Sequence, residues 1–306
     1  EKNKVKLVVF PELCITGYTI GDLVYSPHLL DNALIALNKI ADATKGLDIL
    51  VFVGLPYVCN SLIYNVAAAV YNGKVLGFVP KTFLPNYNEF YEKRHFAQAA
   101  DENIYVKFNG YEVPFGKKII FNSGVYKNFA VCAEICEDLW VATPPSVSHS
   151  LNGAIITANL SCSNETIGKA DYRKTVVSAQ SGANISAYIY ACSGYGESTT
   201  DLVFSGHNLI AENGKILEES ELFENKMIIA DVDVDFLSSE RAKYYNYDYK
   251  KESGYLHVVF DNIDDKSYLD RNFSKTPFVP DDKNELVSRA SLIIRMQAEG
   301  LRKRME

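Results

Sequence analysis

The chain has 306 residues, 47% of them hydrophobic and 23% charged, which is the composition of a globular protein with room for one large domain or two small ones. Its formal net charge of -7 argues against nucleic-acid binding, because contacts to phosphate need a basic surface. No apolar run approaches the roughly 20 residues of a membrane span and no signal-peptide pattern is present, so we expect a cytoplasmic protein that does not contact a membrane.

In chain order, apolar runs rich in β-branched and aromatic residues alternate with stretches of helical periodicity. We predict strands over the apolar runs 5–10, 48–58, 65–71, 74–79, 128–135, 153–160 and 185–192. Their near-continuous hydrophobicity is typical of a sheet buried on both faces. Residues 27–46 and 169–184 space their apolar residues as helices do, and the Asn-Gly pairs at 72–73 and 213–214 predict hairpin turns. This order of elements predicts an α/β fold in which helices cover a mixed sheet.

The C-terminal part of the chain differs in character from the rest. Residues 244–255 are rich in tyrosine and begin a polar tract, which we expect to run over the surface in a role that the sequence does not define. Residues 285–306 predict an amphipathic helix that is interrupted at Gly300.

The cysteines are scattered through apolar runs, at positions 14, 59, 132, 136, 162 and 192. They form no CxxC pair and no Cys/His cluster at the spacing of zinc ligands. We therefore predict reduced thiols and no metal site.

Three predicted strands each end in an unexpected polar group: Glu12 in VVFPE, Lys81 in GFVPK and Cys136 in AEIC. Side chains just beyond strand ends face a crevice in open α/β sheets, so these three are candidate functional residues. A thiolate can attack a carbon–nitrogen bond, but a free thiol is mostly protonated at neutral pH, and the neighbouring Glu137 and Asp138 would raise its pKa further. Cys136 therefore needs a cation and a base, which Lys81 and Glu12 can supply.

Each of these residues also has a structural interpretation that the sequence leaves open. Glu12 could be an acid at a helix entry, Lys81 a solvated loop lysine and Cys136 a small buried hydrophobic residue. The histidines are weaker candidates for the base because none ends a predicted buried strand, and only His95 in EKRHF is kept in reserve.

Five longer segments carry a more specific pattern. They are FPELCITGYTIGDL (10–23), VPKTFLPNYNEFYEKRHF (79–96), AEICEDLW (133–140), NLSCSNETIGKADYR (159–173) and SGYGESTTDLVFSGHNLIAENG (193–214). In this order they resemble the nitrilase superfamily, and within it the glutaminase domains of glutamine-dependent NAD synthetases. A match through nearly the whole chain is far more specific than a single motif. The resemblance implies a nitrilase-like four-layer α-β-β-α sandwich.

The resemblance also implies roles for the three strand-end residues, as a Glu–Lys–Cys triad. Glu12 would be the general base, Lys81 the cation beside the thiolate and the developing oxyanion, and Cys136 the nucleophile. Glu89 matches the further acid that many superfamily members place beside the triad, and an exposed acid remains the alternative.

A pocket for glutamine is implied in the same way. The residues implied to form it are Tyr18, Tyr87, Phe90, Glu137, Ser163 and Lys169. The three aromatic residues would line the pocket, Glu137 would bind the amino group, and Ser163 and Lys169 would lie near the carboxylate of the substrate. The residues alone also allow core aromatics and a solvated Lys169.

The segment GYGESTTD (194–201) has part of a glycine-rich dinucleotide motif. It lacks the third glycine and the strand-to-helix setting, so we do not interpret it as a dinucleotide site. The resemblance implies a loop near the glutaminase site or at a subunit contact, and a simple glycine-rich turn remains an alternative.

The implied reaction is hydrolysis of the glutamine side-chain amide through a thioester on Cys136. Its ammonia would serve a synthetase domain that uses ATP and Mg to amidate deamido-NAD to NAD, and the SGGxDS loop of such a domain does not occur in this chain. We thus predict a glutaminase domain over 1–285 that lacks the first strand and helix of the superfamily, and the start of a linker helix over 286–306. The resemblance implies no cofactor or metal in this domain, and a homo-oligomer.

Two other functions remain open from the sequence. The chain could be an amidase or carbamoylase that acts on another small amide with the same triad. It could also be a catalytically silent assembly module that uses residues 244–255 and the last helix as contact surfaces.

Overall fold

The computed structural model describes residues 3–199, 201–244, 253–261, 269–271, 273, 275, 276, 278–280 and 282–306. The chain divides into two compact units, residues 1–267 and residues 268–306. Most of the tyrosine-rich stretch at 244–255 lies outside the described residues.

The first sheet is built from the first part of the chain, with the strand order β1-β2-β3-β4-β6-β5 among the described residues. Its strands are β1 (Leu7–Val9), β2 (Leu50–Cys59), β3 (Leu62–Tyr71), β4 (Lys74–Pro80), β5 (Ile104–Phe108) and β6 (Tyr111–Phe115). β1 runs parallel to β2, whereas β2, β3 and β4 are antiparallel neighbours. The turn between β3 and β4 falls at the predicted Asn-Gly pair, where both residues adopt the positive φ that a tight hairpin requires.

The second sheet has the order β12-β11-β10-β9-β8-β7-β13 among the described residues. Its strands are β7 (Ile119–Ser123), β8 (Ala130–Ile135), β9 (Ile156–Ser161), β10 (Ala187–Cys192), β11 (Leu209–Glu212), β12 (Lys215–Glu219) and β13 (Leu256–Phe260). β8, β9 and β10 run parallel, so the residues that follow them lie at one edge of the sheet. The predicted strands are confirmed, while β5, β6, β7 and β13 were not predicted from the sequence.

The two sheets pack face to face, and the alternation of side chains along each strand divides the core into layers. Leu50 and Phe52 of β2 share a buried cluster with Val131 and Ala133 of β8, which fills the space between the sheets. The intervening Val51 belongs to a separate cluster on the outer face of the first sheet.

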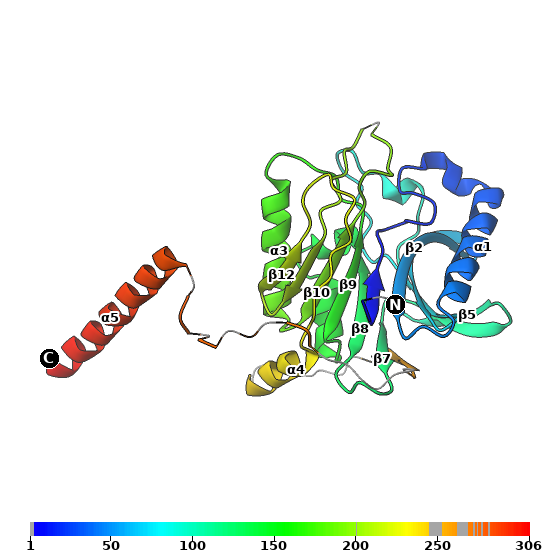
Figure 1. The fold of residues 1–306 in the computed structure, drawn as a ribbon. Coiled ribbons are helices and arrows are strands. Elements are labelled where there is room, and N and C mark those ends of the chain that lie inside the picture. Colours follow the sequence, from blue (N-terminus) through cyan, green and yellow to red (C-terminus); the bar gives the residue numbers. More distant parts are fainter. Residues whose placement is uncertain are drawn as a thin grey trace. The chain divides into compact units, whose positions relative to one another are not determined.

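Helices cover the outer faces of both sheets, as Figure 1 shows for α1 and α3. The helices of the first unit are α1 (Pro27–Ala43), α2 (Pro145–Leu151), α3 (Lys169–Ala183) and α4 (Val234–Lys243), with 3-10 turns η1 (Gly21–Tyr25), η2 (Glu92–Arg94) and η3 (Cys136–Leu139). Leu37 of α1 packs against the first sheet, and Val177 of α3 packs against the second. The predicted α-β-β-α sandwich is confirmed.

The second unit contains one long helix, α5 (Lys283–Met305). The Asp282 side chain caps it by accepting a hydrogen bond from Glu285 N at 2.8 Å. The helix continues through Gly300, so the predicted interruption there is wrong; a glycine inside a helix costs only about 1 kcal/mol. Among the described residues, no helix combines the length and apolar character that crossing a membrane requires.

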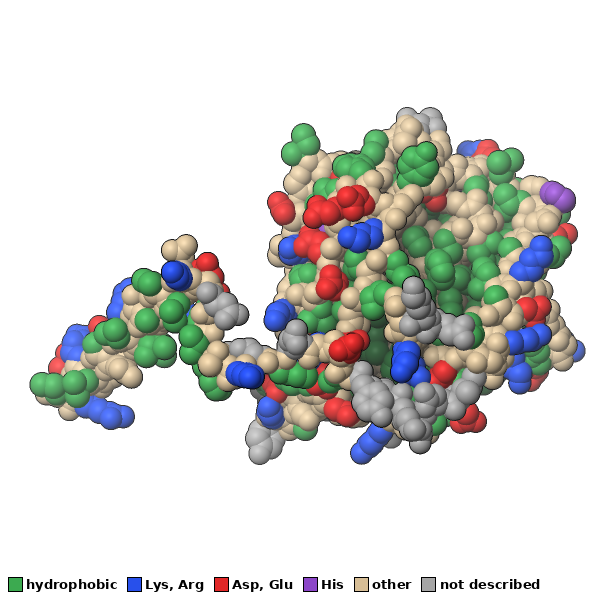
Figure 2. All heavy atoms as spheres, viewed as in Figure 1, with side chains coloured by type: hydrophobic (Ala, Val, Ile, Leu, Met, Phe, Trp, Pro, Cys, Tyr) green, Lys and Arg blue, Asp and Glu red, His purple; other side chains and the backbone are tan. Residues whose placement is uncertain are grey.

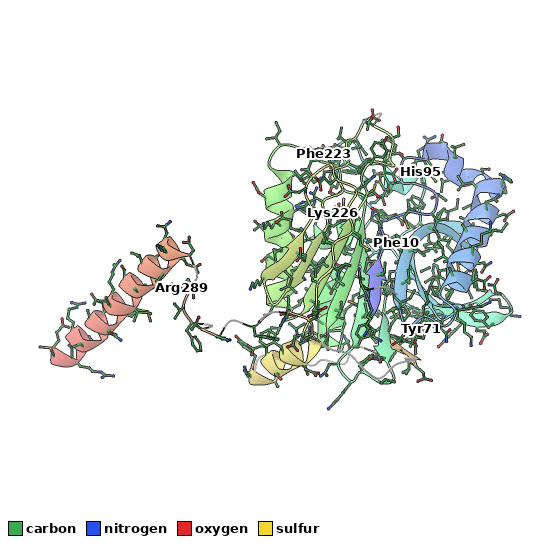
Figure 3. All side chains as sticks on the ribbon, viewed as in Figure 1. Phe10, Tyr71, His95, Phe223, Lys226 and Arg289 are labelled. Carbon is green, nitrogen blue, oxygen red and sulfur yellow. The ribbon has the colours of Figure 1, made fainter. Side chains whose placement is uncertain are left out.

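One face of the first unit has an apolar hollow. Figure 2 shows hydrophobic side chains gathered in it, and Figure 3 places Phe10, directly after β1, in this region. The Phe10 side chain remains 44% exposed.

Candidate active site

Glu12 and Lys81 form a fully buried ion pair. Lys81 directly follows β4, and its Nζ lies 2.7 Å from Glu12 Oε1, with both side chains completely shielded from solvent. Glu12 Oε1 also accepts a hydrogen bond from Asn65 Nδ2 at 2.7 Å, and Oε2 accepts one from the Cys162 backbone N–H at 2.9 Å. These bonds hold the carboxylate in one orientation and offset the cost of desolvating it.

Cys136 is the first residue of η3 and directly follows β8. Its backbone φ of 42° lies in the left-handed region that residues other than glycine rarely adopt, and such strain is concentrated at functional sites. Burial raises the pKa of the Cys136 thiol well above its ordinary value; Glu12 and Glu92 add to this rise, while Lys81 and the Cys162 backbone N–H oppose it. The Cys162 N–H that binds Glu12 also influences the thiol of Cys136, so Glu12, Lys81 and Cys136 act on one another in the same part of the fold.

The further acid beside Lys81 is Glu92 rather than the predicted Glu89. Glu92 Oε1 accepts hydrogen bonds from Lys81 Nζ at 2.7 Å and from Tyr18 OH at 2.8 Å. Burial raises the pKa of Glu92; Lys81 opposes this rise and Glu12 adds to it. Glu89 instead accepts a hydrogen bond from Asn164 Nδ2. The sequence offered two acids three positions apart, and only the turn at η2 directs the second one inward.

Two carboxylates compensate the charge of Lys81. Burial lowers the pKa of Lys81, but Glu12 and Glu92 outweigh this effect and raise it well above its ordinary value. Lys81 is therefore a permanent cation at neutral pH. It can hold a positive charge beside the sulfur while remaining fixed between the two acids.

Asp138 is a second buried acid whose environment the sequence did not reveal. Asp138 lies in η3, two residues after Cys136, and is only 1% exposed. Its carboxylate accepts hydrogen bonds from the backbone N–H groups of Ile135, Thr82 and Phe83, at 2.9, 3.2 and 2.8 Å. Burial raises the pKa of Asp138 to about 8, Glu134 adds to this rise, and the Ile135 and Phe83 N–H groups oppose it.

Four residues of the predicted glutamine pocket form two pairs. Tyr87 and Glu137 are joined by hydrogen bonds, and Tyr18 and Phe90 pack against the same apolar cluster. Tyr87 OH donates to both oxygens of Glu137, at 2.8 and 3.0 Å. Tyr18 and Phe90 pack against the buried cluster of Cys162, Leu202 and Phe204.

The remaining two predicted pocket residues lie at the end of β9 and the start of α3. Ser163 is buried, and its carbonyl accepts a hydrogen bond from Cys192 Sγ at 3.5 Å. Lys169 begins α3, donates to Asn164 Oδ1, and has its Nζ 5.6 Å from the centroid of the Trp140 ring. Lys169 is thus not the freely solvated lysine that its sequence position also allowed.

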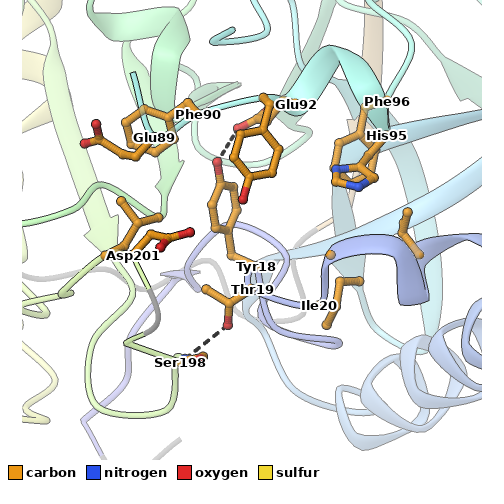
Figure 4. Close-up of a pocket in the computed structure, with 14 residues that line it drawn as sticks. Tyr18, Thr19, Ile20, Glu89, Phe90, Glu92, His95, Phe96, Ser198 and Asp201 are labelled. Carbon is orange, nitrogen blue, oxygen red and sulfur yellow. Dashed lines mark hydrogen bonds between the residues drawn. The ribbon is translucent and has the colours of Figure 1, made fainter. Parts of the chain in front are cut away.

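A cavity of about 210 Å³ lies beside Tyr18, Phe90 and Glu92 (Figure 4). Its lining residues are Tyr18, Thr19, Ile20, Gly21, Val24, Glu89, Phe90, Tyr91, Glu92, His95, Phe96, Ser198, Asp201 and Leu202. The lining contains Tyr18 and Phe90 of the predicted pocket and Glu92, the acid that contacts Lys81. Cys136 is not among the lining residues.

Two residues of the segment GYGESTTD, Glu197 and Ser198, contact the chain at Tyr18 and Thr19. Glu197 accepts hydrogen bonds from Tyr18 N at 2.9 Å and from Thr19 Oγ1 at 2.8 Å, and Ser198 N donates to Thr19 Oγ1 at 3.0 Å. Figure 4 draws the last of these bonds at the cavity wall. These contacts place Glu197 and Ser198 beside Tyr18 and Thr19.

His95, the reserve candidate for a base, is engaged elsewhere. Its Nε2 lies 3.0 Å from Asp22 Oδ1, and its ring packs near those of Tyr25 and Tyr91. The part of the chain that the structure describes contains no group of three or more His, Cys, Asp or Glu side chains arranged to hold a metal ion.

The two packed sheets with polar residues at their strand ends define the class of protein. Residues 1–242 match the model of the carbon-nitrogen hydrolase family, and the chain belongs to this family.

Individual relatives show which members of the family this chain is similar to. The chain is 38% identical to the glutamine-dependent NAD(+) synthetase of Mycobacterium tuberculosis, over 98% of this chain and 46% of that protein. It resembles the crystal structure of a glutamine-dependent NAD(+) synthetase from Cytophaga hutchinsonii, with a TM-score of 0.66 and 30% identity over 74% of this chain and 36% of that one. The chain thus spans about half the length of the curated relatives it matches.

A nitrilase-superfamily amidase from Nesterenkonia AN1 shares the fold. The TM-score is 0.57 at 20% identity, over 78% of this chain and 82% of that one. At this identity the likeness concerns the fold alone.

Proposed function

We propose that this chain hydrolyses the side-chain amide of glutamine through a thioester on Cys136 and releases ammonia. The observation that carries the proposal is the buried Glu12–Lys81 pair at 2.7 Å, with Cys136 on a strained turn beside it. A thiol, a base and a fixed cation are the groups that nucleophilic attack on an amide requires.

The raised pKa of the Cys136 thiol determines how the reaction begins. At neutral pH the buried sulfur holds its proton, so the nucleophile forms as Glu12 takes that proton during attack on the amide carbon. Lys81 then stabilises the negative charge on sulfur and on the carbonyl oxygen of the tetrahedral intermediate.

The same base completes the cycle. Glu12 returns its proton to the departing nitrogen, so ammonia leaves and the γ-glutamyl group remains on sulfur as a thioester. Water, deprotonated by Glu12, then attacks the thioester, and Cys136 leaves with the proton. Glu92 keeps Lys81 in place through its 2.7 Å contact, which supports a positioning role for it in every step.

Charge complementarity supports glutamine as the substrate. Glu137 and Lys169 offer an anion for the ammonium group and a cation for the carboxylate of a free amino acid. Burial raises the pKa of Glu137 and lowers that of Lys169, so both side chains favour an oppositely charged partner. Tyr87 orients Glu137, while Tyr18 and Phe90 provide apolar walls.

For the protein to which this chain belongs, we propose supply of ammonia to a synthetase that amidates deamido-NAD with ATP and Mg. The match to synthetases over 98% of this chain and 46% of their length supports this proposal. The proposed arrangement has residues 1–285 as the glutaminase domain and 286–306 as the beginning of the link to the synthetase, in a cytoplasmic homo-oligomer.

Steady-state assays with glutamine, asparagine and short aliphatic amides test the proposal. We expect hydrolysis of glutamine in preference to the other amides, and none after Cys136→Ala. Turnover of another amide but not of glutamine would instead indicate a different amidase. A wild-type chain that hydrolyses no amide, and whose folding and assembly are the same after Cys136→Ala, would indicate an assembly module.

A further inference from the structure

The carboxylate of Asp138 joins the backbone next to the proposed nucleophile to the backbone next to the proposed catalytic cation. Its Oδ2 accepts from the N–H of Ile135, which directly precedes Cys136. Its Oδ1 accepts from the N–H groups of Thr82 and Phe83, which directly follow Lys81. One buried side chain therefore contacts both the backbone just before Cys136 and the backbone just after Lys81.

These two stretches of backbone come from different sheets. Lys81 follows β4 of the first sheet, whereas Cys136 follows β8 of the second. The hydrophobic core holds the sheets together without fixing the spacing of individual atoms at their edges. A directional link at the edge itself is therefore needed to hold two side chains from separate sheets at a reactive distance.

The Asp138 side chain suits this arrangement of donors. Its Oδ1 accepts from the 82–83 backbone while Oδ2 accepts from Ile135, so both oxygens are engaged as acceptors. An asparagine of the same shape would turn an N–H₂ group toward one of the two sides. It would keep the hydrogen bonds on one side, while on the other side its N–H₂ group would face a backbone N–H group and no hydrogen bond could form.

We propose that Asp138 is a positioning residue that sets the distance between Cys136 and Lys81 by bridging the edges of the two sheets. It acts through these two residues and does not touch the substrate. The proposal rests on the glutaminase function for its kinetic test, and on thiol chemistry alone for a second test.

Glu134 provides a matched control. It is as buried as Asp138, lies on β8 two residues before the nucleophile, and accepts hydrogen bonds from Ser146 N at 2.9 Å and from Tyr188 OH. Its partners all belong to the second sheet and α2 rather than to the strand that carries Lys81. Glu134→Gln should therefore disturb a buried carboxylate network without altering the bridge.

The kinetic test compares Asp138→Asn and Glu134→Gln with the wild-type chain. A misplacement of about 1 Å can cost about 100-fold in rate, so we expect kcat for glutamine to fall about 30- to 100-fold in Asp138→Asn. KM should stay within about threefold, and Glu134→Gln should keep kcat within about threefold of wild type, because neither variant removes a substrate contact. An unchanged kcat in folded Asp138→Asn, or an equal loss in Glu134→Gln, would overturn the proposal.

The second test measures alkylation of Cys136 by iodoacetamide as a function of pH, read by mass spectrometry. Moving Lys81 away removes the influence that lowers the thiol pKa, so the alkylation midpoint should rise in Asp138→Asn and stay unchanged in Glu134→Gln. An unchanged midpoint contradicts the bridge even if the chain proves not to hydrolyse glutamine, which separates its failure from that of the proposed function. If Asp138→Asn does not fold, Asp138→Ser replaces it, since serine keeps an oxygen near Ile135 but is too short to reach residue 83.

Discussion

The proposed catalytic cluster and the wall of the proposed glutamine pocket are held in different ways. Glu12 and Lys81 have fully buried side chains, and each meets a charged partner at 2.7 Å. Tyr87 is 50% exposed, and its partner Glu137 is only half-buried. The buried cluster has little freedom to adjust, whereas the wall can move when a ligand enters. Substitutions in the cluster should therefore act on kcat and stability, and those in the wall on KM.

The largest effect is expected for Cys136→Ala, which removes the proposed nucleophile. We expect the rate of glutamine hydrolysis to fall by at least about 10⁴-fold, as is typical when a covalent nucleophile is lost. Cys132→Ala serves as the control, because Cys132 is a buried thiol on β8, the strand that leads into Cys136, and donates to Ile156 O at 3.6 Å. Equal losses in the two variants would show that packing, not sulfur chemistry, governs the activity.

The next largest effect is expected for Lys81→Met. Removing the cation leaves Glu12 and Glu92 as buried acids without their shared partner, which should cost about 3–5 kcal/mol of unfolding free energy in addition to most of the activity. Denaturant unfolding measures this cost. The matched control is Lys6→Met, whose ion pair with Asp48 at 2.5 Å is partly exposed and should contribute much less. Similar costs in the two variants would contradict the contrast between buried and exposed charges.

Glu137→Gln should affect binding more than chemistry. Loss of the charge that is proposed to meet the substrate ammonium should raise KM for glutamine about 10- to 100-fold, with a smaller change in kcat. Initial-rate kinetics over a range of glutamine concentrations separate the two parameters. Glu112→Gln, an exposed acid on β6, controls for the change in net charge. A fall in kcat at constant KM would assign Glu137 to the reaction itself.

The smallest effect concerns stability at acidic pH. Burial lowers the pKa of His149 from 6.5 to about 4, so the folded state binds this proton less tightly than the unfolded state. The stabilisation is therefore complete above pH 6.5 and is lost as the pH falls toward 4. Between about pH 7 and about pH 5 the loss should amount to about 2 kcal/mol. Denaturant unfolding should show a weaker pH dependence in His149→Gln, and equal dependence would contradict the assignment.

Much of the fold followed from the sequence because strands buried on both faces leave an unmistakable apolar pattern. The runs at 48–58 and 153–160 became β2 and β9 almost unchanged. β5 escaped prediction because most of its residues are exposed, and an edge strand of this kind carries little hydrophobic signal.

The site was predictable to the extent that a polar residue at the end of an apolar strand stands out. That contrast singled out Glu12, Lys81 and Cys136. It could not find Glu92, because a contact with Lys81 across the fold, and not any local pattern, selects it over Glu89. Nor could it find the role of Asp138, because two of the three residues whose N–H groups it accepts from lie 55 and 56 positions away in the sequence.

Attack of the Cys136 sulfur on the amide carbon of glutamine is the step on which the proposed reaction depends. Acid quenching of the wild-type chain during turnover, followed by peptide mass spectrometry, tests it most directly. We predict a γ-glutamyl group on the peptide that contains Cys136 and on none of the peptides that carry the other cysteines. Turnover of glutamine without any acylated Cys136, or acylation at another thiol, would contradict the account.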